Sequence, residues 1–209
     1  MTRKISIQEA LREIKLTEKK LNSNKDATPL IAVKSKDKTV VGESTSEEAF
    51  VAKVTETYQS TKALLSNYHM LKGKVAESNA VNFVTVAGKR MTVSAAIEYK
   101  TSLAFELGLL SKMRHEYASA VRLISNNENV LQREAEANAN AYFSSQTDKN
   151  GADYNDFITK YKEARVSKIV DPLNIEKEIK ELADFIEEFT AEVDNVLTLH
   201  NVNTLIEVD

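Results

Sequence analysis

The 209-residue sequence contains no cysteine, which excludes disulfide bonds and thiolate metal sites and leaves the redox compartment undetermined. Only two prolines and five glycines are present. This scarcity favours long helices over a turn-rich β fold. No stretch reaches the roughly 20 apolar residues of a membrane-spanning helix, and the opening MTRKISIQEAL has no apolar run of signal-peptide length. We therefore expect a mainly α protein of the cytoplasm.

Charge is low overall, with a net value of −3, but it is unevenly distributed. The segment from Lys53 to Arg122 holds ten Lys/Arg against five Asp/Glu, whereas Asp171 to Asp209 holds two against eleven. Such asymmetry can accompany nucleic-acid or membrane binding. The basic residues are spread rather than clustered, so we expect neither of these partners. Instead, the acidic segment is predicted to lie against the basic one, in the same subunit or a neighbour.

The first helix is predicted to begin at Ser6, because Ser6 and Glu9 have the spacing of a capping box. Its apolar stripe consists of Ile7, Leu11, Ile14 and Leu21. Residues 30–41 follow, in which two β-branched runs flank a charged turn. They predict a short β-hairpin insertion.

A second helix is predicted from a capping box at Ser44 or Thr45 to about Asn79. At 1.5 Å per residue, its roughly 33 residues extend about 50 Å. Its apolar stripe consists of Val51, Val54, Tyr58, Thr61, Leu65, Tyr68 and Val75. A stripe of this length needs packing partners along most of the helix.

A third helix is predicted to begin at a cap formed by Thr92 or Ser94 and to continue towards Ala141. Its stripe consists of Leu103, Leu107, Leu110, Tyr117, Val121 and Ile124, with Lys100 and Arg114 on the same side. The periodicity then fades, and residues 137–170 are predicted to be a loop-rich insertion.

The last helix has the clearest pattern. Asp171 is the predicted N-cap, and Pro172 stands at the first helical position. Three-four spacing then relates Ile175, Ile179, Leu182, Ile186, Phe189, Val193 and Val196. This repeat is typical of a coiled coil.

Two helices are followed by similar segments, ESNAVNFVTV after the second and LHNVNTLIEV after the last. Asn79 and Asn201 are predicted to end these helices in the left-handed conformation. The strands that follow, 81–86 and 204–208, are expected to pair with each other or with the 30–41 hairpin, because isolated strands leave amides unpaired. The predicted fold is a mainly α single domain, 1–209. It is an elongated antiparallel helical bundle or coiled coil with a short β-hairpin and a small β clasp at one end.

Three segments carry a resemblance to a known family: QEALREIKLTEKKL, LKGKVAESNAVNFVTVAGKRMTV and EIKELADFIEEFTAEVDNVLTLHNVNTLIEV. The matching residues are Lys74, Val75, Ser78, Asn79, Asn201 and Thr204, whereas Ile14, Ala76 and Val202 replace the family's arginine, asparagine and tryptophan. Together the segments resemble the septicolysin-like family of small helical bacterial and phage proteins. The resemblance implies an elongated, self-associating helical fold with no catalytic residues.

Motifs for chemistry are incomplete. His69, His115 and His200 lack the spacing of a helical metal site. The Gly-Lys pairs at 73–74 and 88–89 lack the other residues of a P-loop. In the possible calcium loop that starts at Asp148, Gly151 stands at the fourth position where the sixth is required, and Thr159 replaces the final glutamate. No Gly-x-Ser-x-Gly elbow occurs. We expect no catalytic residue, metal or cofactor, and hence no enzyme.

The basic residues leave two interpretations open. Lys100 and Arg114 interrupt an apolar stripe, and a buried cation needs an anion. Carboxylates of the last helix can supply it. Alternatively, the five residues Lys89, Arg90, Lys100, Arg114 and Arg122 line a site for a phosphate-bearing small molecule.

The favoured hypothesis is a non-enzymatic, self-associating helical binding or scaffold protein. If the resemblance to phage proteins also reflects where the chain comes from, the protein is encoded by a phage. An alternative is a phage counter-defence protein of the host cytoplasm that sequesters a nucleotide-type signalling molecule. A further alternative is a structural component of the virion.

Overall fold

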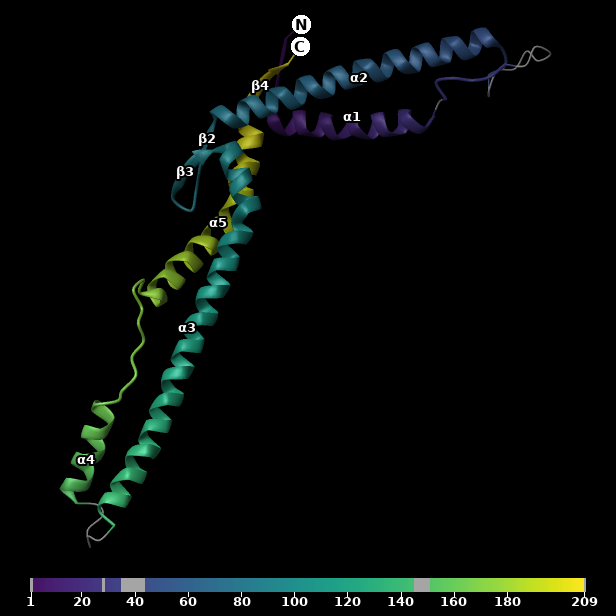
Figure 1. Cartoon of the computed structure of the whole chain (residues 1–209). Coiled ribbons are helices and arrows are strands. Elements are labelled where there is room, and N and C mark those ends of the chain that lie inside the picture. Colours follow the sequence, from purple (N-terminus) through teal and green to yellow (C-terminus); the bar gives the residue numbers. More distant parts are fainter. Residues whose placement is uncertain (1, 28, 35–43, 145–150, 209) are drawn as a thin grey trace. The chain divides into compact units, whose positions relative to one another are not determined.

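The computed structural model describes residues 2–27, 29–34, 44–144 and 151–208 (Figure 1). Within these residues, five helices and two antiparallel two-stranded sheets are formed. The predicted mainly α class with short β elements is therefore confirmed. Contacts divide the chain into a terminal unit, Met1–Thr101 with Glu188–Asp209, and a central unit, Ser102–Glu187. The single domain 1–209 stays a prediction.

In the terminal unit, the first and last strands pair with each other. Strand β1 (Arg3–Ser6) runs antiparallel to β4 (Leu205–Val208), with Ile5 opposite Ile206. The predicted pairing of β4 with the strand after the second helix is therefore wrong. That strand, β2 (Phe83–Val86), forms a hairpin with β3 (Lys89–Thr92). A local hairpin satisfies its amides without a distant partner.

The β2–β3 turn consists of Ala87 and Gly88, whose φ angles are 47° and 69°. Two successive positive φ values characterise the type I′ turn, whose twist matches that of the flanking strands. Glycine adopts this conformation without a steric penalty. The turn chemistry thus explains why this strand pairs with its neighbour in sequence.

Helix α1 (Ile7–Ala27) begins with the predicted capping box. The Ser6 amide donates to Glu9 Oε2 at 2.9 Å, and the Glu9 amide donates to Ser6 Oγ at 3.2 Å. The hydrogen bond from the Ser6 backbone lowers the pKa of the Glu9 carboxyl. Ile7 and Ile14 of the predicted stripe are buried, whereas Leu11 is 42% exposed.

Helix α2 (Glu47–Val81) packs beside α1, and the β1–β4 sheet closes their common core. The core cluster consists of Ile5, Ile7, Ala10, Ile14, Leu71, Val75, Ile206 and Val208. Three of these residues come from the two strands. The clasp is therefore part of the core as well as a link between the chain ends.

The ends of α2 differ from the prediction. Its N-cap is Ser46, whose side chain accepts from the Ala49 amide at 3.2 Å. The helix continues past Asn79 to Val81, and Asn82 follows in an extended conformation, with φ −87°. The Asn82 side chain donates to the Ser78 carbonyl and hydroxyl oxygens, both at 2.9 Å. A side-chain cap therefore replaces the predicted left-handed stop.

The buried side of α2 is only partly the predicted stripe. Val75 is buried, and Val54, Thr61 and Tyr68 are half-buried. The other stripe residues, Val51, Tyr58 and Leu65, are exposed. The first arm of the predicted 30–41 hairpin does not form a strand, because residues 31–34 have no regular secondary structure. Its second arm lies outside the described residues.

Helix α3 (Val93–Tyr142) follows the hairpin directly. The hydroxyl of the predicted cap, Thr92, accepts from the Ala95 amide at 3.1 Å. The helix is 50 residues long, so its predicted continuation towards Ala141 is confirmed. In the terminal unit it meets helix α5 (Ile175–Asn203). Lys100 Nζ lies 2.6 Å from Asp194 Oδ1, as predicted for an acidic helix against a basic one.

The central unit contains a helix that was not predicted. Helix α4 (Ala152–Glu163) lies within the expected loop-rich insertion, beside the end of α3 (Figure 1). Lys162 Nζ donates to Gln132 Oε1 at 2.8 Å, and Asn138 Nδ2 donates to the Tyr161 hydroxyl at 3.4 Å. Irregular chain then leads to α5.

Helix α5 begins three residues later than predicted. The Asp171 carboxylate accepts from the Leu173 amide at 3.2 Å and from the Ile175 amide at 2.8 Å. Pro172 therefore lies in a turn before the helix, not at its first position. Likewise, Asn201 lies inside α5 and does not end it. The predicted apolar stripe is confirmed, with Ile186, Phe189 and Val193 buried and Ile175, Ile179, Leu182 and Val196 half-buried.

Candidate functional site

The five predicted anion-binding residues are divided between the two units. Lys89, Arg90 and Lys100 belong to the terminal unit, and Arg114 and Arg122 to the central unit. The Arg90 guanidinium lies over the Phe83 ring, 4.4 Å from its centroid. Lys100 is engaged by Asp194. The salt bridge matches the pairing expected in the first interpretation, but Lys100 is exposed and not buried as its place on the apolar stripe predicted.

Arg114 was predicted to lie on the buried stripe of α3, but its side chain is exposed. The buried side passes through Leu110, Met113 and Tyr117 instead. Arg114 therefore needs no buried anion. Arg122, also exposed, is eight residues further on, or about 12 Å along the helix axis.

The inner face of α3 in the central unit has a heptad pattern. Leu103 and Leu110 are buried, and Glu106, Met113 and Tyr117 are half-buried. The Tyr117 hydroxyl donates to Glu176 Oε2 at 3.1 Å, and this hydrogen bond raises the pKa of Tyr117. One oxygen of Glu106 is buried without a hydrogen-bond partner in the described part of the chain.

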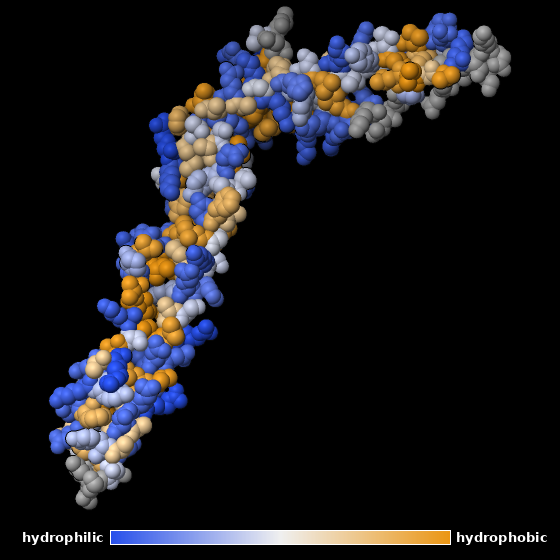
Figure 2. Space-filling model, viewed as in Figure 1, coloured by the Kyte–Doolittle hydropathy of each residue, from blue (hydrophilic) through white to orange (hydrophobic). Residues whose placement is uncertain are grey.

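A second side of α3 is apolar but uncovered. We define the α3 outer face as Phe105, Leu109, Lys112, Glu116 and Leu123, which follow one another at helical spacings of four, three, four and seven. The three apolar residues are 81%, 51% and 60% exposed, respectively. Lys112 and Glu116 form an ion pair at 3.8 Å. Hydrophobic residues are also visible on the surface in Figure 2.

The central unit also contains an aromatic cluster, where the end of α3 meets α4. Tyr142 is the last residue of α3, and Phe143 follows it in a turn. Tyr154, Phe157 and Tyr161 come from α4. Phe143 is only 5% exposed and contacts Tyr154 and Phe157 at centroid distances of 5.9 and 6.1 Å. It therefore anchors α4 to α3.

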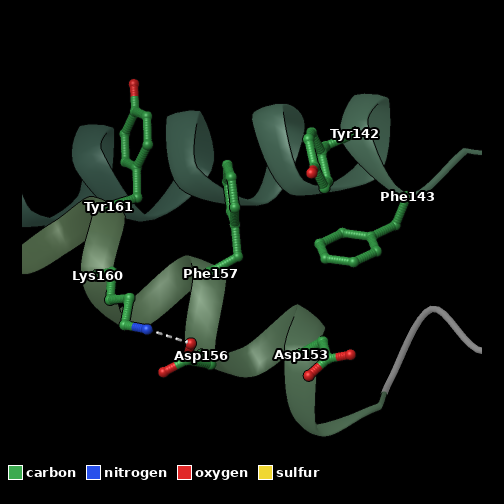
Figure 3. Close-up of a pocket in the computed structure, with 7 residues that line it drawn as sticks. All are labelled: Tyr142, Phe143, Asp153, Asp156, Phe157, Lys160 and Tyr161. Atoms are coloured by element: carbon green, nitrogen blue, oxygen red, sulfur yellow. Dashed lines mark ion pairs between the residues drawn. The ribbon is translucent and has the colours of Figure 1, made fainter.

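Beside this cluster lies a cavity with a volume of about 460 Å³ (Figure 3). We call it the aromatic pocket. It is lined by Tyr142, Phe143, Asp153, Asp156, Phe157, Lys160 and Tyr161. Lys160 Nζ lies 2.7 Å from Asp156 Oδ2, which raises the pKa of Lys160. The pocket thus combines ring faces with charged groups.

The aromatic pocket was missed in the sequence because the fading apolar periodicity was taken to mean a loop. A signal was nevertheless present. Five of the fourteen Phe and Tyr residues fall between positions 142 and 161, and Tyr154, Phe157 and Tyr161 have helical three-four spacing. Such aromatic enrichment is typical of a packed helix rather than of a polar loop.

His200 near the end of α5 gives the terminal unit a pH dependence. Its Nδ1 lies 3.2 Å from Thr204 Oγ1, and burial lowers its pKa. Because the unfolded chain keeps a pKa of about 6.5, it binds more protons than the folded chain below that pH. Stability is therefore present above about pH 6.5 and is lost as the pH falls.

We expect the urea midpoint to fall between about pH 7 and pH 5, and to fall less in His200→Gln, which cannot titrate at this position. Urea unfolding of both proteins at the two pH values measures the difference. Equal losses in the two proteins would contradict the assignment to His200.

Among the described residues, no group of three or more His, Asp or Glu is placed to hold a metal ion. No helix in the same residues is long and apolar enough to cross a bilayer. No protein-family model matches the chain, and neither a curated protein nor a solved structure is significantly similar to it. The septicolysin-like resemblance therefore stays a prediction.

Proposed function

We propose that this protein is a non-enzymatic helical protein of the cytoplasm that self-associates and acts by binding another protein. The observation that carries the proposal is the α3 outer face, where Phe105, Leu109 and Leu123 are all more than half exposed. Exposed apolar residues scattered singly are normal on soluble proteins. A row on one side of a helix, with an ion pair inside it, is typical of an association surface.

The outer face is complementary to itself in an antiparallel arrangement. A twofold axis at the level of position 114 places Phe105 opposite Leu123 of the second copy, since the two are equidistant from that position. Leu109 then faces position 119, a serine, whose small side chain leaves room for the leucine. The same axis places Lys112 opposite Glu116, twice. One register therefore pairs Phe105 with Leu123 and also brings opposite charges together, and the resulting interface is closed.

The free energy of association expected for this dimer is that of a reversible complex. Fully burying an apolar side chain stabilises by about 1.5–3 kcal/mol, so the exposed parts of these residues contribute about 1–2 kcal/mol each. Six such side chains across two copies give about 6–12 kcal/mol, from which the cost of association, about 4 kcal/mol or more, is subtracted. The balance is about 2–8 kcal/mol, so we expect a weak, concentration-dependent dimer whose dissociation constant lies between about 1 μM and the millimolar range.

The test uses charge reversal on the outer face, measured by sedimentation of the full chain over a series from micromolar to millimolar concentrations. Lys112→Glu places carboxylates opposite each other twice, and we expect it to weaken the dimer at least about tenfold. The double variant Lys112→Glu/Glu116→Lys restores opposite charges both within α3 and across the twofold axis. We expect it to recover the wild-type dissociation constant to within about threefold.

Phe105→Glu is the companion variant, because it replaces the most exposed apolar side chain of the outer face. We expect it to be monomeric with an unchanged melting temperature, since Phe105 makes little contact within its own chain. A wild-type monomer throughout the series, or a double variant as weak as Lys112→Glu, would reject this dimer.

The nucleotide-sequestering and virion roles have no specific observation in their favour. Lys100 is held by Asp194, and Arg90 lies over Phe83. Arg114 and Arg122 lie in the other unit.

A further inference from the structure

The aromatic pocket contains a row of stacked rings. Tyr142 and Phe157 are 5.6 Å apart with an interplanar angle of 18°, and Phe157 and Tyr161 are 6.2 Å apart at 24°. Phe143 stands edge-on to Phe157, at 89°. The three stacked rings therefore present their faces along one direction (Figure 3). Aromatic faces carry partial negative charge and attract cations.

One end of this row already holds a cation. The Arg165 guanidinium lies 4.0 Å from the centroid of Tyr161. At the other end, the Tyr142 ring meets Phe143 in a T-shaped contact with a centroid distance of 5.0 Å, but Tyr142 remains 70% exposed, and no cation among the described residues lies over its ring. The intramolecular contact shows that a ring of this row accepts a guanidinium group. The exposed Tyr142 ring is available to such a group from another molecule.

The charges beside the rings favour a cation as well. Asp153 and Asp156 both line the pocket, together with the single cation Lys160. Lys160 is paired with Asp156 at 2.7 Å. Asp153 forms no ion pair within the part of the chain that the structure describes, so the lining has one unmatched negative charge. A guanidinium is suited to such a site, because it stacks flat on a ring while its N–H groups donate to a carboxylate.

From these observations we propose that the aromatic pocket binds a guanidinium-type organic cation, which stacks on Tyr142 and is neutralised by Asp153. The group belongs either to an arginine side chain of a partner protein or to a small guanidinium compound. The proposal uses none of the α3 outer-face residues and stands whether or not the protein dimerises.

The test is an NMR titration of the full-length protein, in which the tyrosine ring signals report on Tyr142 and Tyr161. The probes are methylguanidinium, N-acetyl-arginine amide and an arginine-containing tripeptide. The matched negative probe is N-acetyl-citrulline amide, which has nearly the same shape as the arginine compound but no charge. We expect saturable shifts with the three cations, weakened by added salt, and none with the citrulline compound.

Two variants assign the binding to the pocket. Tyr142→Leu keeps an apolar side chain but removes the ring face, and Asp153→Asn keeps the shape but removes the charge. Both positions are exposed, so the fold should persist, and circular dichroism checks this. We expect each variant to weaken the binding of the three cations at least about fivefold. Glu163→Gln, on the same helix but outside the pocket lining, is expected to leave the affinity unchanged.

The result also separates the two sources of the cation. Tighter binding of the tripeptide than of methylguanidinium identifies a basic segment of a partner protein, whereas equal affinities identify a small compound. The proposal is overturned if no cation gives a saturable shift, if the citrulline compound binds equally well, or if both pocket variants bind like the wild type.

Discussion

Replacing Ile206 by Asp is expected to destabilise the terminal unit by at least about 4 kcal/mol, because the new carboxylate lies in the core without a cation to pair with. Ile206 is 7% exposed and lies opposite Ile5 in the β1–β4 sheet. Both side chains belong to the cluster that α1 and α2 share. A loss of this size is a large part of the roughly 5–15 kcal/mol that typically stabilises a protein.

The matched control is Leu205→Asp, because Leu205 is the preceding residue of the same strand and is 61% exposed. Its carboxylate remains in water, and we expect a change within about 0.5 kcal/mol. Urea unfolding measured by circular dichroism gives both values. The loss in Ile206→Asp should shrink at low pH, since burial raises the pKa of a carboxyl and the neutral form is tolerated better. Similar losses in both variants would show that the strand pairing, and not the core, is what the substitution disturbs.

Replacing Phe189 by Ala is expected to cost about 3–5 kcal/mol, the range measured when a buried aromatic side chain is removed and leaves a cavity. Phe189 is fully buried on α5, and its ring centroid lies 4.9 Å from that of Tyr99 on α3. The substitution therefore removes the largest fully buried side chain of the terminal unit. The midpoint of urea unfolding is expected to fall accordingly, with little change in the slope.

Leu199→Ala is the control for this substitution. Leu199 is on the same helix but is 61% exposed, so its truncation leaves no cavity. If Phe189→Ala were as stable as Leu199→Ala, the packing of α5 on α3 in the terminal unit would be refuted.

The elements that the sequence predicted well are those whose information is local. Ser6 and Glu9 form the expected capping box, Thr92 caps α3, and the α5 stripe is at least half-buried over its whole length. Each depends on residues within a few turns of one another. The Lys100–Asp194 ion pair was also anticipated, because the charges of the two helices were opposite.

The buried side of α2 shows where periodicity is insufficient. Val51, Tyr58 and Leu65 repeat at seven residues, and so do Val54, Thr61 and Tyr68. The two rows were indistinguishable as apolar repeats. Packing against α1 buries the second row more deeply and leaves the first exposed. The choice depends on the position of another helix, which the α2 sequence does not contain.

Strand partners were unpredictable for a related reason. Strand β1 is the four residues RKIS, of which two are charged, and nothing in this pattern indicates a strand. These four residues form a strand because β4 offers them unpaired backbone amides. The aromatic pocket likewise forms only when the α3 end and α4 come together, so Tyr142 and Asp153 had no visible relation in the sequence.

The pairing of Arg3 with Val208 has a consequence for biosynthesis. When α1 and α2 leave the ribosome, the strand that completes their core has not been translated. The side chains of Ile5 and Ile7 then lack their β4 partners while α3, α4 and α5 are made. Closing so long a loop is also slow compared with forming a helix. The nascent chain thus carries an open apolar surface until β4 has been translated, and surface of this kind is what makes incompletely folded chains prone to aggregate.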